Sequence, residues 1–451
     1  MPEELTALDE KLSQLRAALE QQDSVTALAI LDRFYAPDQA ELLEGLDEDE
    51  QAALLPALDP VESAELLAEM EDSAAAELVA ALPTATLARI MDEMAPDDAA
   101  DLLANLEPEQ AQSILAALED PDEIRPLLLY PETSAGGLMT PEFLALRRRM
   151  TAAEALQAIR DWKPRHESLA DLFVVDAQGA VCGQVDLRDL IVASSDTLVR
   201  DIMDPDVISV LVGTDQEECA QLMLRYSLLV LAVVNAEGAL LGVITADDVM
   251  DVIEEEATED IQRLGGAQPL DEPYLDTPVL TVARKRVGWL LLLFVTESLT
   301  GSVLRHFENE LQSLVALSFF VPLLIGTGGN AGSQTTSTII RALAVGDIRL
   351  RDTLATLWHE IRAAVFLALI MGVVAYGRAL MWGTGPGLAL VVSISIATIV
   401  LWANGLGAVL PLLAAALRID PTVVSGPAMS TLVDATGLFI YFTISRLIIG
   451  L

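Results

Sequence analysis

The stretch ARKRVGWLLLLFVTESLTGSVLRHF (residues 283–307) divides the chain into two unlike halves. Three basic residues are followed by about twenty mostly apolar ones, the length that a helix needs to cross a bilayer. Four further apolar stretches follow at 314–342, 358–382, 387–417 and 422–449. Together with 287–305 they predict five transmembrane helices. A buried globular core is a poor alternative, because five long apolar helices with so few charges would need a much larger polar shell.

Charge is distributed just as unevenly. Residues 1–283 hold 60 acidic and 15 basic side chains, whereas residues 284–451 hold 8 acidic and 11 basic ones. A surface this negative repels the phosphates of nucleic acid and favours cations as ligands. The acidic half lies on the same side of the predicted spans as most of the basic flanking residues, which makes that side cytoplasmic. Those flanking residues are Arg284, Lys285, Arg286, Arg341, Arg349, Arg351 and Arg418, with Arg378 and Arg446 opposite.

Two internal repeats organise the acidic half. Residues 45–116 repeat every twelve residues, from GLDEDEQAALLP to NLEPEQAQSILA, each copy with a Pro/Asp/Glu turn and an Ala/Leu stripe. Such copies must stack to bury their stripes, so they predict an all-helical superhelix, and the recurring prolines exclude one long helix. The second repeat pairs 138–191 with 202–250, each unit reading as strand, helix, two strands around a DAQG or NAEG turn, and helix.

Asp434 lies deep in the last apolar stretch, in STLVDATGLFIYF (430–442). A carboxylate at that depth costs several kcal/mol unless it faces water or a cation, so it predicts an ion path. The alternative is a carboxyl group hydrogen-bonded to Ser430 or Thr436 for packing. Glu297 also lies within a predicted span, where a partner helix or the membrane edge could accommodate it.

Two glycine-containing runs suggest irregular backbone near Asp434. GTGGNAGSQTTST (326–338) lies within the second predicted span, and SGPAMST (425–431) precedes Asp434 by one turn. Irregular backbone at membrane depth is tolerated where it lines a cavity, so we predict two helix breaks beside an ion path. Close packing between helices is the alternative for the first run.

The available side chains restrict the ion. Two cysteines and three histidines make a zinc, copper or iron–sulfur site improbable, so the metal must accept oxygen ligands. Mg²⁺ keeps much of its water and is held by one or two carboxylates, which suits Asp434 and its copy on the axis of a homodimer. This argument does not exclude Ca²⁺ or Mn²⁺.

The chain resembles the MgtE magnesium transporter/channel family over nearly its whole length. The resemblance rests on AGGLMTP (135–141), EATEDIQRLG (256–265), VPLLIGTGGNAGSQ (321–334), and ALRIDPTVVSGP through DATGLFIYF. It implies a homodimer in the cell membrane with a helical N-domain (1–134), an α/β pair of cystathionine-β-synthase (CBS) units (135–262), a plug helix or linker (263–283) and a five-helix pore domain (284–451). The plug helix would lie around residues 264–281.

The resemblance also implies site residues. Asp434 would be the pore acid, and the others would form a cytoplasmic Mg²⁺ sensor: Glu65, Asp97, Asp101, Glu217, Asp248, Asp251, Glu256, Glu259 and Asp260. Ser227 stands where the family often has an acid, and Gly426 stands where some members have an asparagine. Asp189 and Asp248 have the spacing of CBS ribose-binding residues, which suggests ATP or another adenine nucleotide, although Asp186 replaces the usual threonine.

Repulsion between carboxylates suggests how the binding of Mg²⁺ could control the pore. Packing of the N-domain on the CBS pair would bring Asp97 and Asp101 towards Asp248 and Asp251, and Mg²⁺ would convert their repulsion into a bridge. High cytoplasmic Mg²⁺ would then close the pore by a population shift. A proton- or Na⁺-coupled transporter using Glu297 and Asp434, and a membrane-anchored nucleotide receptor, are the alternatives. The sequence contains no arrangement of residues typical of an enzyme active site.

Overall fold

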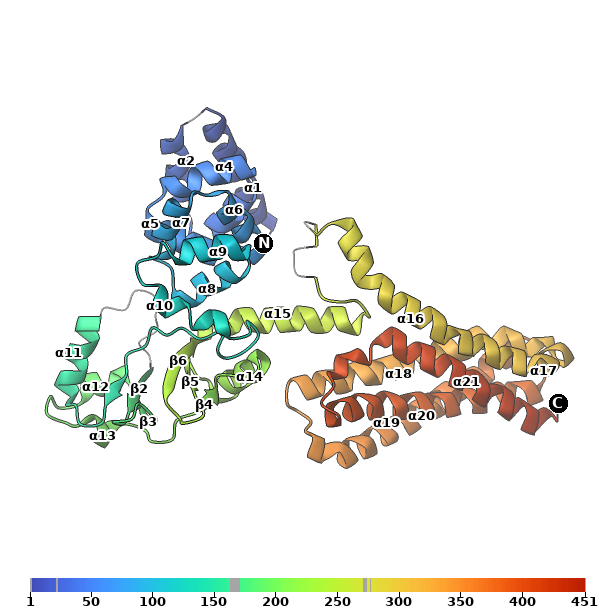
Figure 1. The fold of residues 1–451 in the computed structure, drawn as a ribbon. Coiled ribbons are helices and arrows are strands. Elements are labelled where there is room, and N and C mark those ends of the chain that lie inside the picture. The colour runs from blue at the N-terminus through green and yellow to red at the C-terminus, as the bar shows by residue number, and fades with distance from the viewer. Residues whose placement is uncertain (1, 22, 163–170, 271–273, 276, 451) are drawn as a thin grey trace. The chain divides into compact units, whose positions relative to one another are not determined.

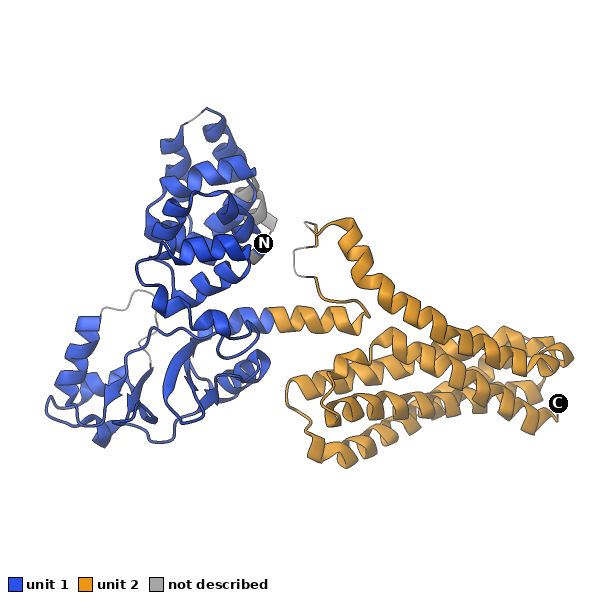
Figure 2. Ribbon diagram, in the orientation of Figure 1, with its two compact units in different colours: residues 1–254 blue, residues 255–451 orange. Residues whose placement is uncertain are grey.

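The computed structural model describes residues 2–21, 23–162, 171–270, 274–275 and 277–450. It contains two compact units, residues 1–254 and 255–451 (Figure 2). The first unit holds the helical repeats and both CBS units, and the second holds the apolar helices. Each unit is described by itself below.

The N-terminal helices follow the twelve-residue repeat closely. After α1 (Pro2–Glu20) and α2 (Ser24–Leu31), seven helices begin at residues 36, 48, 60, 72, 84, 96 and 108. These are α3 (Ala36–Glu44), α4 (Glu48–Leu54), α5 (Pro60–Ala68), α6 (Asp72–Ala81), α7 (Thr84–Met91), α8 (Pro96–Ala104) and α9 (Pro108–Leu115), with α10 (Pro121–Ile124) after them. Several start with proline in the first turn, where its missing N–H costs nothing.

Each of these helices packs on the helix two positions along the chain rather than on its neighbour. The pairs α3 with α5, α5 with α7 and α7 with α9 form one row, and α4 with α6 and α6 with α8 form the other. The predicted superhelix is therefore confirmed (Figure 1). Its core of leucines and alanines is continuous with the apolar residues of the second CBS unit, including Leu231 and Ile244.

The two CBS units have the predicted order of elements. The first contains β1 (Leu146–Arg147), α11 (Ala152–Trp162), β2 (Asp171–Val175), β3 (Val181–Asp186), α12 (Leu187–Val192) and α13 (Val199–Ile202). The second contains β4 (Ser209–Leu211), α14 (Gln216–Tyr226), β5 (Val230–Val234), β6 (Leu240–Thr245) and α15 (Ala246–Leu264). In each three-stranded sheet the first pair of strands is parallel and the second antiparallel, and a bridge between Ala180 and Ala239 joins the two hairpins.

The second unit contains five helices that are long and apolar enough to cross a membrane, as predicted. They are α16 (Val279–His306), α18 (Val321–Ala344), α19 (Thr353–Met381), α20 (Pro386–Ala416) and α21 (Gly426–Ile449), with the short α17 (Glu308–Ser313) after α16. Helix α20 is the most buried of the five and packs against α18, α19 and α21 (Figure 1). Helix α16 is largely exposed and packs against α21.

Three local predictions are wrong. The glycine run at 326–338 does not break its helix, because α18 is continuous from Val321 to Ala344. The run at 425–431 is a helix start, where Ser425 caps α21 by accepting from the N–H of Ala428. The plug helix around 264–281 is absent from the described part of that segment, since α15 ends at Leu264 and α16 begins at Val279. Residues 271–273 and 276 of that segment lie outside the described residues.

Candidate functional site

Asp434 lies half-buried in the middle of α21 without a protein partner for its carboxylate. No described residue donates a hydrogen bond to it or forms an ion pair with it, and both residues proposed for a packing role are engaged elsewhere. Ser430 Oγ lies 3.3 Å from Ser333 Oγ, and Thr436 Oγ1 donates to the Leu432 carbonyl at 2.8 Å. Glu297 on α16 is the acid that interacts electrostatically with Asp434. A carboxylate in this position is stabilised by water, a cation or a proton.

The glycines of α18 bring that helix close to its neighbours. A Cβ atom at Gly328 would lie 2.7 Å from Val433 Cγ1, and one at Gly332 would lie 2.9 Å from Met429 Cε. A Cβ atom at Gly407 of α20 would lie 2.6 Å from the Gly332 carbonyl oxygen. These glycines allow the close packing that small residues provide in membrane helices. The packing alternative for the run is therefore the one that the structure supports.

The same run leaves a polar stripe uncovered within the subunit. Gly326, Asn330 and Gln334 follow one another at intervals of four residues and are all exposed. Residues at this spacing share one face of a helix. Amide side chains facing lipid would lose their hydrogen bonds, so this face requires water or another polar surface. Asp434 and the stripe thus offer the carboxylate and amide oxygens that a hydrated cation requires.

A second acidic site lies within residues 1–254, where α8 and α15 begin. Asp97 in the first turn of α8 is 8% exposed, and its Oδ1 has no hydrogen-bond partner. Burial raises the pKa of Asp97 well above its ordinary value, and the charges of Asp98 and Asp248 raise it further. Burial also raises the pKa of Asp248, whose Oδ2 accepts from Thr245 Oγ1 at 2.6 Å. A buried carboxylate interacting with a half-buried one favours a bound cation or a proton.

The neighbouring turn of α15 faces another acid of the helical repeats. Burial raises the pKa of Glu69, at the C-terminal end of α5, and the charges of Asp251 and Asp247 add to this effect. Asp251 itself has a pKa raised by burial and by Glu254 and Asp247. Glu69 and Asp247 were not among the predicted residues. Glu69 follows the predicted Glu65 by one helical turn, which is the only signal that could have found it.

The remaining predicted sensor residues of this unit have the following surroundings. Glu65 is exposed on α5. Asp101 lines a cavity of 300 Å³ together with Tyr130 and Glu132. Glu217, in the first turn of α14, accepts a hydrogen bond from Gln221 at 3.1 Å. Packing of the repeats on the CBS pair therefore brings Asp97 to Asp248, while Asp101 lies at a different cavity.

In the second unit, the end of α15 contacts the loop before α21. Arg263 donates to Asp420 Oδ2 at 2.6 Å and also pairs with Glu259. Burial raises the pKa of Asp260, as do the charges of Asp420 and Glu259, whereas Arg263 and Arg341 lower it. Glu256 lies one turn before these residues on the same helix. Asp420 was not predicted, because an acid in a short loop between apolar stretches looks like any solvated loop residue.

The residues predicted for a nucleotide differ in their surroundings. Asp189 is half-exposed and its Oδ1 lies 3.7 Å from Arg188 Nε. A cavity of 400 Å³ nearby is lined by Asp171, Asp186 and Arg188. Asp248 instead completes a capping box at the start of α15, where its carboxylate accepts from Thr245 N as well as from the hydroxyl. The two CBS units are therefore not equivalent in this respect.

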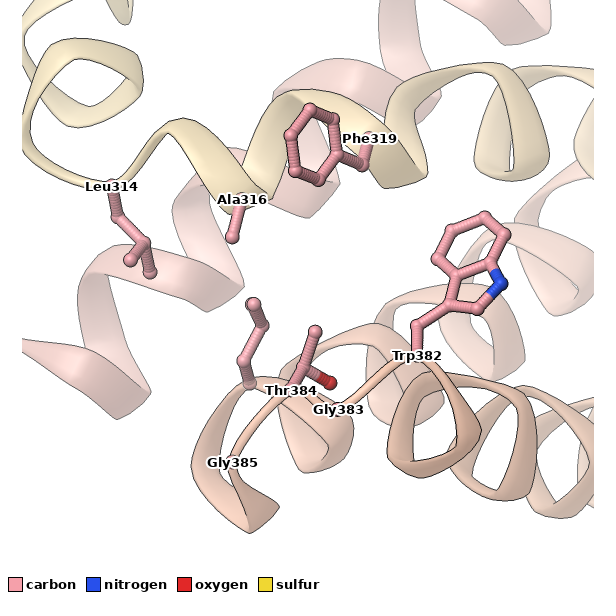
Figure 3. A pocket seen from close by; sticks show the side chains of 8 residues that line it. Leu314, Ala316, Phe319, Trp382, Gly383, Thr384 and Gly385 are labelled. Carbon is pink, nitrogen blue, oxygen red and sulfur yellow. The ribbon is translucent and has the colours of Figure 1, made fainter.

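Two features at the opposite end of the apolar helices are structural. Arg446 donates to the buried Glu310 carboxylate, with Nε at 3.0 Å, and this hydrogen bond lowers the pKa of Glu310. A cavity of 740 Å³ lies between Ala316 and Phe319 on one side and Trp382 and Thr384 on the other (Figure 3). No ionisable side chain lines it. Neither feature brings together groups that could bind a metal, and the described residues contain no cluster of three or more His, Cys, Asp or Glu arranged for one.

Sequence comparisons identify the family. Residues 35–133 match the MgtE intracellular N domain, residues 135–196 and 199–255 match CBS domains, and residues 321–444 match the MgtE divalent cation transporter domain. The chain is 44% identical over 327 residues to the magnesium transporter MgtE of Thermus thermophilus, covering 72% of each protein. It is 33% identical to the magnesium transporter MgtE of Enterococcus faecalis over 73% of this chain and 72% of that one. The chain therefore belongs to the MgtE family, as a multi-pass membrane protein.

Comparisons with solved structures agree with this family assignment for the first unit. The soluble part of a magnesium transporter aligns with a TM-score of 0.51 and 32% identity, covering 55% of this chain and 99% of that one. The cytosolic domain of the Mg²⁺ channel MgtE in complex with ATP aligns with a TM-score of 0.51 and 37% identity, covering 53% and 99%. The predicted helical N-domain and CBS pair are thereby confirmed, and the five apolar helices of the second unit agree with the rest of the predicted fold class, apart from the plug helix.

Proposed function

We propose that this protein is a Mg²⁺-selective channel that mediates magnesium uptake across the cell membrane and is closed by Mg²⁺ bound to its cytoplasmic half. The observation that carries the proposal is the Asp434 carboxylate, which lies within a membrane helix and has no partner among the described residues. The exposed Asn330 and Gln334 of α18 support it, because they add polar oxygens within the same five-helix bundle.

The chemistry of Mg²⁺ fits such a path. Mg²⁺ dehydrates reluctantly and is held through its waters by one or two carboxylates. A two-fold homodimer would place two copies of Asp434 on one axis, and polar oxygens along α18 would contact the hydration shell. Because Asp434 is one carboxylate per subunit, its attraction is sufficient to concentrate the ion without trapping it.

The cytoplasmic acids supply the proposed gate. The buried Asp97 interacts electrostatically with the half-buried Asp248, which costs free energy unless a cation or a proton neutralises them. Mg²⁺ would bind between them and favour the compact arrangement of the repeats on the CBS pair. We further propose that Glu256, Glu259 and Asp260 extend this response along α15 towards the membrane helices, since Arg263 already links that helix to the loop before α21.

Transport can be tested with one residue and a matched control. Wild-type protein should restore growth of a strain deficient in Mg²⁺ uptake, and Asp434→Asn should not, although it preserves the size of the side chain. Asp347→Asn, which removes an acid from the loop after α18, should restore growth as wild type does. Growth with Asp434→Asn at wild-type protein levels would refute the proposed path.

A proton- or Na⁺-coupled transporter is the second candidate, and one observation favours it. Glu297 interacts electrostatically with Asp434, so the two carboxylates could share a proton. Currents measured in patches at a fixed Mg²⁺ gradient distinguish the two functions. A channel passes current that is independent of the pH and Na⁺ gradients, whereas a coupled transporter depends on one of them and loses that dependence in Glu297→Gln.

We also propose that an adenine nucleotide binds the CBS pair. The similar cytosolic domain was solved in complex with ATP, and in this chain the half-exposed Asp189 follows Arg188, which lines a cavity with Asp171 and Asp186. Calorimetric titration of the full chain with ATP should give binding that Asp189→Asn weakens at least several-fold. Equal affinity in wild type and variant would assign the nucleotide elsewhere.

A further inference from the structure

A cavity of 670 Å³ lies within the second unit, beside the first turns of α16. Its walls are the end of α15, the main chain of residues 266–269, the first turns of α16 and the loop before α21. The linker is fixed against α16 by two contacts: Gln268 N donates to the Lys285 carbonyl at 3.2 Å, and Lys285 Nζ donates to the Pro269 carbonyl. The cavity is therefore built from four segments and is not a gap beside a single helix.

The charges lining this cavity are mainly positive. Among the described residues that line it, Arg263, Arg284 and Lys285 are basic and Glu259 is acidic. Glu259 and Asp420 are both paired with Arg263, so this cluster is already compensated. Arg284 is exposed and pairs with no acid in the described part of the chain. The cavity thus presents the charge of Arg284 to whatever occupies it, and the Lys285 ammonium, which also contacts the linker, lies in the same wall.

A neutral donor adds to these cations. Trp289 lines the cavity, and its Nε1 is buried without a hydrogen-bond partner among the described residues. The indole packs against Gly266, where a Cβ atom would lie 2.5 Å from Nε1 and where φ is +75°. A buried N–H without an acceptor costs about 1–3 kcal/mol, so an acceptor at this place would be favoured.

The cavity stands at the cytoplasmic surface of the bilayer. Arg284 and Lys285 immediately precede the apolar part of α16, and Trp289 follows them by about one turn. Basic residues and tryptophan are enriched at this level of membrane proteins. Anionic lipids give the cytoplasmic leaflet its negative charge, and basic pockets between transmembrane helices on this side suit lipid head groups.

We propose that this cavity binds the phosphate-bearing head group of an anionic phospholipid of the cytoplasmic leaflet. The phosphate oxygens would accept from Arg284, Lys285 and the Trp289 indole, and the acyl chains would lie along the exposed apolar surface of α16. Because the lining includes Thr422 and Val423, directly before α21, the lipid would contact the loop that leads to the helix carrying Asp434. This site is independent of the proposed transport function and is tested separately from it.

Fluorescence quenching of Trp289 tests the proposal on the full chain. The protein is reconstituted in phosphatidylcholine vesicles containing a minor fraction of brominated phosphatidylglycerol or, in a parallel series, brominated phosphatidylcholine. The difference between wild type and Trp289→Phe isolates the signal of Trp289 from the other four tryptophans. We expect phosphatidylglycerol to quench Trp289 at a lower mole fraction than phosphatidylcholine does, by about five-fold for each contributing cation.

Two double variants show which basic residues cause the preference for phosphatidylglycerol. Arg284→Gln with Lys285→Gln should abolish the preference for phosphatidylglycerol. Arg349→Gln with Arg351→Gln removes the same charge from the same side of the membrane and should preserve it. Equal quenching by the two lipids in wild type would mean ordinary boundary lipid and overturn the proposal. Absence of quenching by either lipid, or an equal response of Trp289 to inorganic phosphate in phosphatidylcholine vesicles, would overturn it as well.

Discussion

Replacing Asp97 by asparagine should stabilise the compact arrangement of residues 1–254 when no Mg²⁺ is present. Asp97 is 8% exposed and stands beside Asp248, and burial raises the pKa of both carboxyl groups. Two carboxylates about 5 Å apart repel by roughly 3 kcal/mol at an effective dielectric constant near 20. Asparagine has nearly the same shape but no charge, so it removes the cost of burying a carboxylate as well as the repulsion, and the expected gain is about 2–3 kcal/mol at neutral pH.

The sign of the pH dependence follows from the raised pKa values. A carboxyl group whose pKa is higher in the folded protein than in the unfolded chain is best accommodated when protonated. Its cost to the folded state is absent below its ordinary value of 3.8, grows as the pH rises from there to its raised value, and is fully present above it. The stability of wild-type α8 should therefore fall from acid to neutral pH, and that of Asp97→Asn should fall less.

Hydrogen exchange of the α8 amides in the full chain measures this effect locally. A gain of about 2–3 kcal/mol corresponds to roughly a hundred-fold slower exchange without Mg²⁺. Millimolar Mg²⁺ should slow exchange strongly in wild type and much less in Asp97→Asn, because one of the two ligands is gone. Asp49→Asn, on the exposed surface of α4, should behave as wild type. Unchanged or faster exchange in Asp97→Asn without Mg²⁺ would refute the reasoning.

Three further outcomes are expected. Gly328→Ala should destabilise the membrane unit by about 1–3 kcal/mol through overpacking, and Gly326→Ala, whose Cβ atom would meet nothing within 4 Å, should leave its thermal unfolding unchanged. Burial raises the pKa of Cys219 to about 12, so at pH 8 a maleimide should label Cys182 of the native chain and reach Cys219 only after unfolding. Glu310→Gln should lower the melting temperature, because it leaves the Arg446 guanidinium without its carboxylate, and Arg446→Gln in the same chain should restore part of the loss.

The fold could be predicted wherever the local pattern determines the structure. Proline and acidic residues recur at the start of each repeat, and this fixed where the helices begin. The length of the apolar stretches fixed the five spans. The glycine run at 326–338 misled us, because glycine breaks a helix or allows a close contact depending on what packs against it. Val433 and Met429 decide in favour of contact, and they lie on a helix about a hundred residues further along the chain.

Prediction of the candidate sites from the sequence was limited in the same way. Asp434 stood out because an acid within an apolar stretch is rare and needs an explanation. Glu69 and Asp420 did not, because each is one acid among many with ordinary neighbours in sequence. Their distinction comes from burial and from charges contributed by distant segments, as Asp251 does for Glu69. Local sequence carries no information on such pairs.

In the N-terminal domain, each helical repeat packs on the repeat two positions further along the chain. This arrangement restricts how many repeats can be inserted or deleted. Adding or removing two successive repeats keeps every later helix in its own row. Loss of a single repeat would transfer all later helices to the opposite row, and would carry Asp97 with them to the wrong side of the stack. Insertions and deletions that preserve the domain's pairing with α15 should therefore come in even numbers.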